Sequence, residues 1–172
     1  TISSTSNRLN SVSGTGARTH SYHADGNTAG YLNIVFAYNN RGRVKSATVG
    51  TTVTNYVYNA LGELAKKSGG GGTVLFMYDE AGHMLGEYTS TGGLTQETVW
   101  MNDIPVATLR PKTGGGIDIF YVHTDHLNTP RKISQPSDNK LRWRWDGDAF
   151  GGGSTNNNPE GVGDFRYQYR FP

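Results

Sequence analysis

The sequence predicts an all-β fold of stacked antiparallel β-hairpins with little helix. Three observations lead to this prediction. A short sequence frame recurs at intervals of about 20 residues along the first half of the chain. In each copy, aromatic residues occupy every second position before the turn, which places them on one face of a strand. No stretch combines apolar residues at helical spacing with capping residues at its ends.

The recurring frame consists of a tyrosine, then Asn or Asp, and then a glycine three residues further on. Its clearest copies are FAYNNRGRV (36–44), YVYNALGEL (56–64) and FMYDEAGHM (76–84). The positions predicted to shape the architecture are Tyr38, Gly42, Tyr58, Gly62, Tyr78 and Gly82. Residues 21–29 fit the same frame, and residues 3–12 resemble the end of a further copy with Asn7 in place of the glycine.

The frame has a simple physical explanation. An Asn or Asp at the first position of a turn can accept hydrogen bonds from backbone N–H groups. A glycine three residues later can adopt positive φ without steric cost. The residues after the glycine then begin a return strand, so each copy is predicted to be one β-hairpin. Because a single hairpin is only marginally stable in water, neighbouring copies must stack beside one another.

The composition limits the classes of function. The formal net charge is +2 and the positive residues are scattered along the sequence, so nucleic-acid binding is not expected. There are no cysteines, which excludes disulfides and thiolate metal sites. No apolar stretch approaches the length of about 18 residues that indicates a membrane-spanning helix. Ten Tyr, six Phe and three Trp supply apolar area for a folded structure.

With these repeats, the chain resembles the Rhs/YD-repeat proteins of bacteria, which share their repeat type with the teneurins and with the shell proteins of ABC toxins. The second half of the chain strengthens the resemblance. The segments similar to successive parts of the family's core region are VWMNDIPVATLRP (99–111), YVHTDHLNTPR (121–131) and LRWRWDGDAFG (141–151). FRYQYRFP (165–172) is similar to the start of the family's R-F-P-G-Q motif, and the sequence stops before its Gly and Gln.

The resemblance implies two regions and a structural function. Residues 1–98 would be YD-repeat hairpins, about five copies with the first one partial. Residues 99–172 would be a core-like region continuous with the same sheet. In the family, such repeats form part of a spiral sheet or shell that encloses or displays a C-terminal toxin or other cargo domain. The resemblance therefore implies a secreted or cell-surface protein of a bacterium.

The resemblance also implies the partners and the chemistry. The expected partners are neighbouring YD repeats or identical subunits at open sheet edges, and the cargo domain of the parent chain. The family cleaves itself with aspartates downstream of its R-F-P-G-Q region, and no such position carries over to this sequence. No catalytic residue, cofactor or metal is therefore expected, and the chain is predicted not to be an enzyme.

The segment YVHTDHLNTPR allows three interpretations. His123, Asp125 and His126 lie within four residues, as in a metal site or a His/Asp hydrolase pair. The spacing itself supplies neither a third ligand nor a nucleophile. We favour a structural corner, in which Asp125 accepts hydrogen bonds from turn N–H groups and Pro130 stiffens the chain. Arg131 is then expected to hold a carboxylate in a bidentate pair, and His126 to donate to a carbonyl oxygen.

Two further functions stay open besides the structural one. The main alternative is a self-assembling extracellular filament, built by edge-to-edge addition of strands. A carbohydrate-binding surface could use Trp143 and Trp145, which alternate with Arg142 and Arg144. That alternation is also typical of a strand with one apolar face and one charged face, which is the interpretation we favour.

Overall fold

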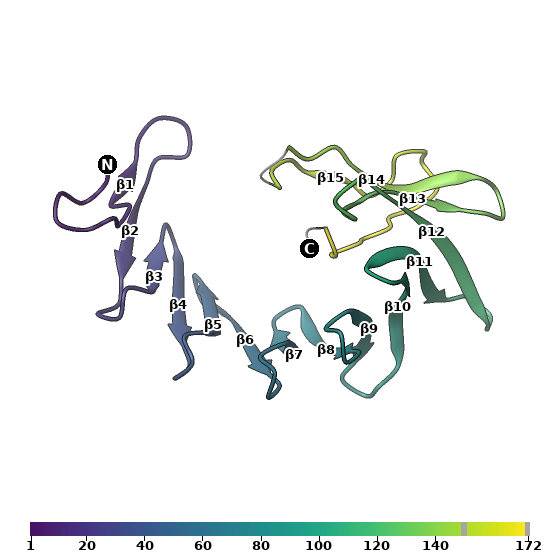
Figure 1. Ribbon diagram of the computed structural model, residues 1–172, viewed down its shortest axis with the longest axis horizontal. Coiled ribbons are helices and arrows are strands. Elements are labelled where there is room, and N and C mark those ends of the chain that lie inside the picture. Colours follow the sequence, from purple (N-terminus) through teal and green to yellow (C-terminus); the bar gives the residue numbers. More distant parts are fainter. Residues whose placement is uncertain (149–150, 171–172) are drawn as a thin grey trace. The chain divides into compact units, whose positions relative to one another are not determined.

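The computed structural model of the protein describes residues 1–148 and 151–170 (Figure 1). No helix occurs among these residues, and fifteen strands form one open antiparallel sheet in the order of the chain, β1 to β15. The prediction of an all-β fold made of stacked antiparallel hairpins is confirmed. Within the motifs quoted above, Ala149, Phe150, Phe171 and Pro172 lie outside the described residues.

The chain divides into two compact units, Thr1–Leu75 and Phe76–Pro172. The strands of the first unit are β1 (Ser11–Val12), β2 (Arg18–Tyr22), β3 (Thr28–Tyr31), β4 (Ile34–Tyr38), β5 (Val44–Val49), β6 (Thr52–Tyr58) and β7 (Leu64–Gly69). Strand β8 (Gly72–Tyr78) contains the boundary between the units.

The strands of the second unit are β9 (Met84–Thr89), β10 (Leu94–Met101), β11 (Ile104–Pro111), β12 (Ile117–Thr124), β13 (Pro130–Gln135), β14 (Lys140–Trp145) and β15 (Thr155–Asn156). The division into units reflects packing. The boundary predicted between residues 98 and 99 reflects sequence motifs, and it stays a prediction.

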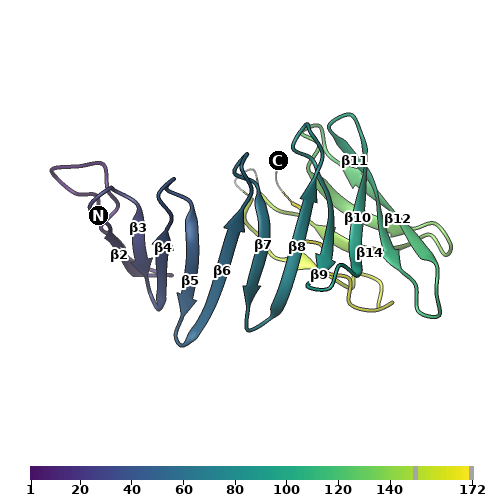
Figure 2. The same cartoon turned by 90° about the horizontal axis from the view of Figure 1, so that it is seen from below.

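The hairpins of the first unit form a single layer without a buried core, because the side chains on their strands are at most partly buried. In β4 the half-buried side chains of Ile34, Phe36 and Tyr38 alternate with the exposed Val35 and Ala37. Among residues 1–75, all of which the structure describes, no side chain is fully buried. Figure 2 shows these strands following one another in chain order. The folded structure of this unit is therefore stabilised by strand pairing and by contacts between adjacent hairpins.

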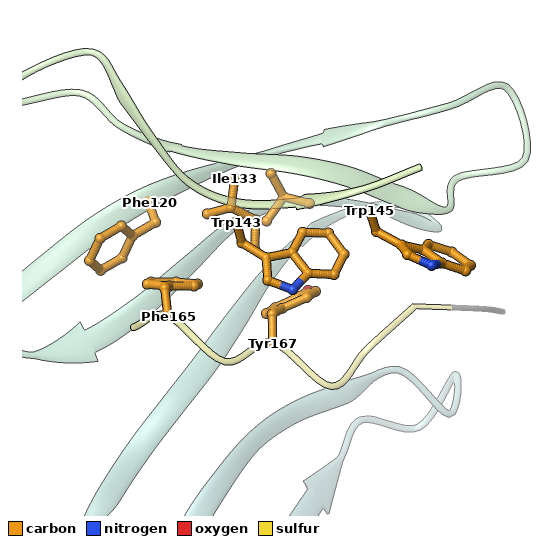
Figure 3. Close-up of a cluster of buried hydrophobic side chains, with 7 residues drawn as sticks. Phe120, Ile133, Trp143, Trp145, Phe165 and Tyr167 are labelled. Atoms are coloured by element: carbon orange, nitrogen blue, oxygen red, sulfur yellow. The ribbon is translucent and has the colours of Figure 1, made fainter. Parts of the chain in front are cut away.

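The second unit contains a hydrophobic core on one face of its strands (Figure 3). Its buried members are Phe120, Val122, Ile133, Trp143, Trp145, Phe165 and Tyr167. Ile133 and Trp143 are completely buried and lie opposite each other on β13 and β14. Alternation along β14 places both tryptophans on this face, while Arg144 is exposed. The expected strand with one apolar face is thus present.

Residues 157–170 cover this core without forming a regular strand. Phe165 packs against Phe120 with ring centroids 4.8 Å apart, and Tyr167 meets Trp143 edge-on at 5.5 Å. Arg110 of β11 fastens the segment, because its guanidinium lies 3.5 Å from the centroid of the Phe165 ring and donates to the carbonyl oxygen of Arg166. Burial lowers the pKa of Arg110 to about 10.

None of the described residues forms a helix that is long and apolar enough to cross a membrane.

The core predicts a sharp difference between two isoleucines in adjacent strands of the second unit. Ile133 is fully buried, whereas the side chain of Ile119 is about half exposed at 48%. Ile133→Ala should lower the free energy of unfolding by about 2–5 kcal/mol, since it leaves a cavity. Ile119→Ala should cost less than about 1 kcal/mol. Denaturant unfolding followed by tryptophan fluorescence measures both, and equal losses would contradict the assigned core.

Candidate architectural site: the repeated turn and its aromatic rung

The repeated turn closes the predicted hairpins by one recurring set of hydrogen bonds. In residues 39–43, the N–H of Gly42 donates to the carbonyl oxygen of Asn39 over 3.0 Å. The N–H of Asn39 donates to the carbonyl oxygen of Arg43 over 2.9 Å. The side-chain oxygen of Asn39 accepts from the N–H groups of Arg41 and Arg43 at 2.9 and 3.1 Å. Residues 59–63 and 79–83 repeat both backbone hydrogen bonds.

The glycine of this turn occupies a left-handed conformation. Gly42, Gly62 and Gly82 have φ values of +73°, +90° and +88°. In each of the hairpins β4–β5 and β6–β7, the strand register shifts at the tyrosine before the turn. This is a three-residue hairpin loop in which a type I turn is followed by a bulge residue at positive φ.

The segment YVHTDHLNTPR contains the same turn. The N–H of Asn128 donates to the carbonyl oxygen of Asp125 over 3.1 Å, and the N–H of Asp125 donates to that of Thr129 over 3.0 Å. Asp125 Oδ1 accepts from the N–H groups of Leu127 and Thr129 at 2.9 and 3.1 Å. Asn128 takes the place of the glycine with a φ of +60°, a conformation that Asn tolerates better than most residues.

Arg131 links this turn to the segment that follows β14. Its Nε donates to Asp125 Oδ2 over 2.8 Å, and its Nη1 donates to the carbonyl oxygen of Gly147 over 3.0 Å. The contact with Asp125 is therefore single, and not the bidentate pair expected from the sequence, because the other carboxylate oxygen, Oδ1, accepts from the N–H groups of the turn. Burial opposes ionisation of Asp125, but the hydrogen bonds from Arg131, Leu127 and Thr129 outweigh it and lower the pKa.

The remaining polar residues of the segment do not converge on one point. His126, expected to donate to a carbonyl oxygen, is exposed and forms no hydrogen bond with the residues that the structure describes. His123 Nε2 lies 2.8 Å from Ser134 Oγ. Pro130 is fully buried at the start of β13. Across residues 1–148 and 151–170, no group of three or more His, Asp or Glu side chains is arranged to hold a metal ion.

Successive hairpins are joined by an aromatic rung, by which we mean an aromatic side chain that donates a hydrogen bond to a backbone carbonyl of the preceding hairpin. Tyr58 Oη donates to the carbonyl oxygen of Val44 over 2.9 Å. Tyr38 Oη donates to that of Thr28 over 2.8 Å. In both cases the acceptor lies two residues after the turn glycine. Burial raises the pKa of Tyr58, so its phenol stays protonated and able to donate at neutral pH.

The rung extends beyond the predicted tyrosines. Tyr22 Oη donates to the carbonyl oxygen of Leu9 over 2.8 Å, which makes residues 3–12 part of the series. Asn7, expected in the place of the glycine, is not among the residues with positive φ. In the second unit, Trp100 Nε1 donates to the carbonyl oxygen of Met84 over 3.1 Å. An indole thus replaces a phenol at the same place in the frame.

A cation or an imidazole from the preceding hairpin covers the ring of each of three rungs. The pairs are Arg8 over Tyr22 at 5.4 Å, Arg43 over Tyr58 at 5.9 Å and His83 stacked on Trp100 at 4.6 Å. Each covering residue directly precedes the residue whose carbonyl accepts the rung hydrogen bond. The aromatic side chain is therefore held at its polar end and on its face by one hairpin.

His83 has a carboxylate at each ring nitrogen. Nδ1 lies 2.9 Å from Asp79 Oδ2, and Nε2 lies 2.9 Å from Asp103 Oδ1. Hydrogen bonding to Asp79 first, and to Asp103 second, raises the pKa of His83. The hydrogen bond from His83 also lowers the pKa of Asp79. The His83 ring thus connects the turn before β9 to the turn before β11.

The frame is evident in the sequence at Tyr38, Tyr58 and Tyr78, but two of its members are not. Asn128 stands three residues after Asp125, which is the spacing of the frame with Asn in place of Gly. Trp100 precedes the next turn as the tyrosines do, but the turn after it is shorter, which hides the match. The carbonyl acceptors carry no sequence pattern, because any residue supplies a backbone oxygen.

Comparison with known proteins leaves the family open, since no protein-family model and no curated protein matches the chain. The function is therefore inferred from the geometry of the turn and the rung.

The turn geometry predicts that glycine is required at Gly62. A Cβ at this position would occupy the space of the Arg43 guanidinium, in addition to the strain of positive φ. Gly62→Ala should lower the free energy of unfolding by more than about 1 kcal/mol. Gly71→Ala is the matched control, because nothing lies within 4 Å of its added Cβ. Urea unfolding followed by circular dichroism compares them, and a neutral Gly62→Ala would sink the turn assignment.

The contacts of His83 predict a pH dependence of stability. Because the folded pKa is raised above 6.5, the stabilisation is complete below pH 6.5 and disappears as the pH rises through the folded pKa. The urea midpoint of the second unit should therefore fall as the pH rises above about 6.5, and His83→Gln should reduce this fall. His126→Gln replaces an exposed histidine, and this variant should show the same fall of the urea midpoint as the unchanged protein. An unchanged pH profile in His83→Gln would contradict the assignment.

Proposed function

We propose that the chain is a non-catalytic structural β-repeat segment of an Rhs/YD-repeat shell that encloses or displays a C-terminal toxin or other cargo. The resemblance of the motifs to that family suggests the shell, the cargo and a secreted or cell-surface location. The single observation that carries the structural part of the proposal is the aromatic rung, which recurs from hairpin to hairpin. Its purpose is to fix the spacing of repeats, which is the property that an extended wall needs.

The polar residues of the site support a structural function, because their side-chain atoms form hydrogen bonds within the protein. Both carboxylate oxygens of Asp125 have partners, Oδ1 in the turn and Oδ2 with Arg131. Both ring nitrogens of His83 have carboxylate partners. A hydrolase centred on His123, Asp125 and His126 receives less support. His123 Nε2 lies within hydrogen-bond reach of Ser134 Oγ, but Asp125 is engaged by the turn and by Arg131, so it does not orient the imidazole as the third member of a triad would.

The open sheet favours a second candidate, a self-assembling extracellular filament. Strands β1 and β15 lie at the two ends of the strand order. Strand β15 pairs with β14 through two residues, Thr155 and Asn156. An edge strand presents N–H and C=O groups that another chain can pair with, so identical subunits could add edge to edge.

Electron microscopy and light scattering over a concentration series separate the two candidates. A shell segment should give particles whose mass does not grow into regular polymers as the concentration rises. Filaments that lengthen with concentration would overturn the shell proposal in favour of the second candidate. Asn156→Pro removes a backbone donor from β15 and should prevent filament growth if that edge is used. Asn156→Ala is the control, because it removes the same side chain and keeps the backbone donor.

A further inference from the structure

A groove in the first unit lies between the turn ends of two successive hairpins, β4–β5 and β6–β7, which are neighbours in Figure 2. It has a volume of about 600 Å³, within the range of about 300–1,000 Å³ that is common for ligand sites. Every charged residue that lines it is basic, namely Arg41, Arg43 and Lys45. Such a groove attracts anions.

Two of these cations are held in place before any ligand arrives. The Arg43 guanidinium lies over the Tyr58 ring and against Gly62, which leaves its position little freedom. Arg41 Nη1 donates to the carbonyl oxygen of Ala60 over 3.2 Å. A guanidinium has five N–H donors, so most donors of both residues stay available for an anionic ligand. Preorganisation of this kind lowers the ordering cost of binding.

The neighbouring groove shows that this charge is not a general property of the repeat. It lies one hairpin earlier, between the turns of residues 23–27 and 39–43, and has a similar volume of about 550 Å³. Its lining contains Asp25 and His23, and no Lys or Arg among the described residues. The two grooves share Tyr38 and their architecture. The cations are therefore a feature of one groove, added to a common framework.

The charge of the whole first unit strengthens the field in this groove. Residues 1–75 contain seven Lys and Arg against two Asp and Glu, a formal charge of +5. Residues 76–172 contain nine against twelve, a formal charge of −3. Of the two carboxylates in the first unit, Glu63 accepts a hydrogen bond from Asn59 Nδ2 over 2.6 Å. A surplus of this sign in one unit draws polyanions toward it.

We propose that this groove binds an acidic polysaccharide through its carboxylate or sulfate groups. The guanidinium groups of Arg41 and Arg43 match the bidentate geometry of such anions. The exposed amide of Asn40, which also lines the groove, suits the hydroxyl groups between them. Single-stranded nucleic acid fits less well, because binding it relies on open aromatic faces. Arg43 already covers the ring of Tyr58.

Fluorescence anisotropy with a labelled polygalacturonate oligosaccharide tests the proposal, with a heparin oligosaccharide for the sulfate arm and single-stranded DNA as comparison. The double variant Arg41→Gln/Lys45→Gln should weaken binding of an acidic sugar about tenfold or more. Lys66→Gln/Lys67→Gln removes the same charge from exposed positions on β7, outside the groove, and should change binding less than about threefold. Circular dichroism checks that both variants are folded.

Three results would overturn the proposal. Equal losses in the two double variants would mean that the general charge of the unit, and not the groove, attracts the sugar. Absence of binding to both oligosaccharides at low salt would remove the site. Binding of single-stranded DNA as tight as that of the sugars, with the same loss in Arg41→Gln/Lys45→Gln, would assign the groove to another polyanion.

Discussion

A β-hairpin standing alone cannot bury enough apolar surface to be stable in water, and this constraint shapes the whole molecule. The chain meets it by making each hairpin depend on its neighbour. The rung hydrogen bond from Tyr58 to the carbonyl oxygen of Val44 joins side chain to backbone, so it fixes the register of hairpins independently of the side chains at the acceptor position. Stacking of Arg43 on the same ring adds a second contact between the same two hairpins.

The two units meet the constraint in different ways. Residues 1–75 contain no fully buried side chain, so their order comes from strand pairing, turns and rungs. Residues 76–170, apart from 149–150, add a hydrophobic core, in which Phe165 and Tyr167 of the C-terminal segment cover Phe120 and Trp143. Because the first unit has no core, the residue types near its turns can differ from one hairpin to the next. One groove can therefore carry three cations while its neighbour carries Asp25.

Local features of this structure were predictable from the sequence, and long-range ones were not. Gly62 and Asn59 mark a turn because positive φ and side-chain capping depend on residues a few positions apart. The packing of Phe165 on Phe120 joins residues far apart in the sequence, and no spacing indicates it. The same holds for Trp145 and Arg131, which were expected on a strand and at a corner but not in contact at 4.8 Å. The functional expectations drawn from family resemblance stay proposals.

Hydrogen exchange of backbone amides in Tyr58→Phe tests the central claim most directly, with Tyr56→Phe as the control in the same strand. If the rung couples successive hairpins, loss of the Tyr58 hydroxyl should accelerate exchange in β6–β7 and also in the preceding turn and β5, where Val44 lies. Tyr56→Phe should leave the preceding turn unchanged. Faster exchange confined to β6–β7, or equal effects of the two variants, would contradict the claim that rungs hold the repeats together.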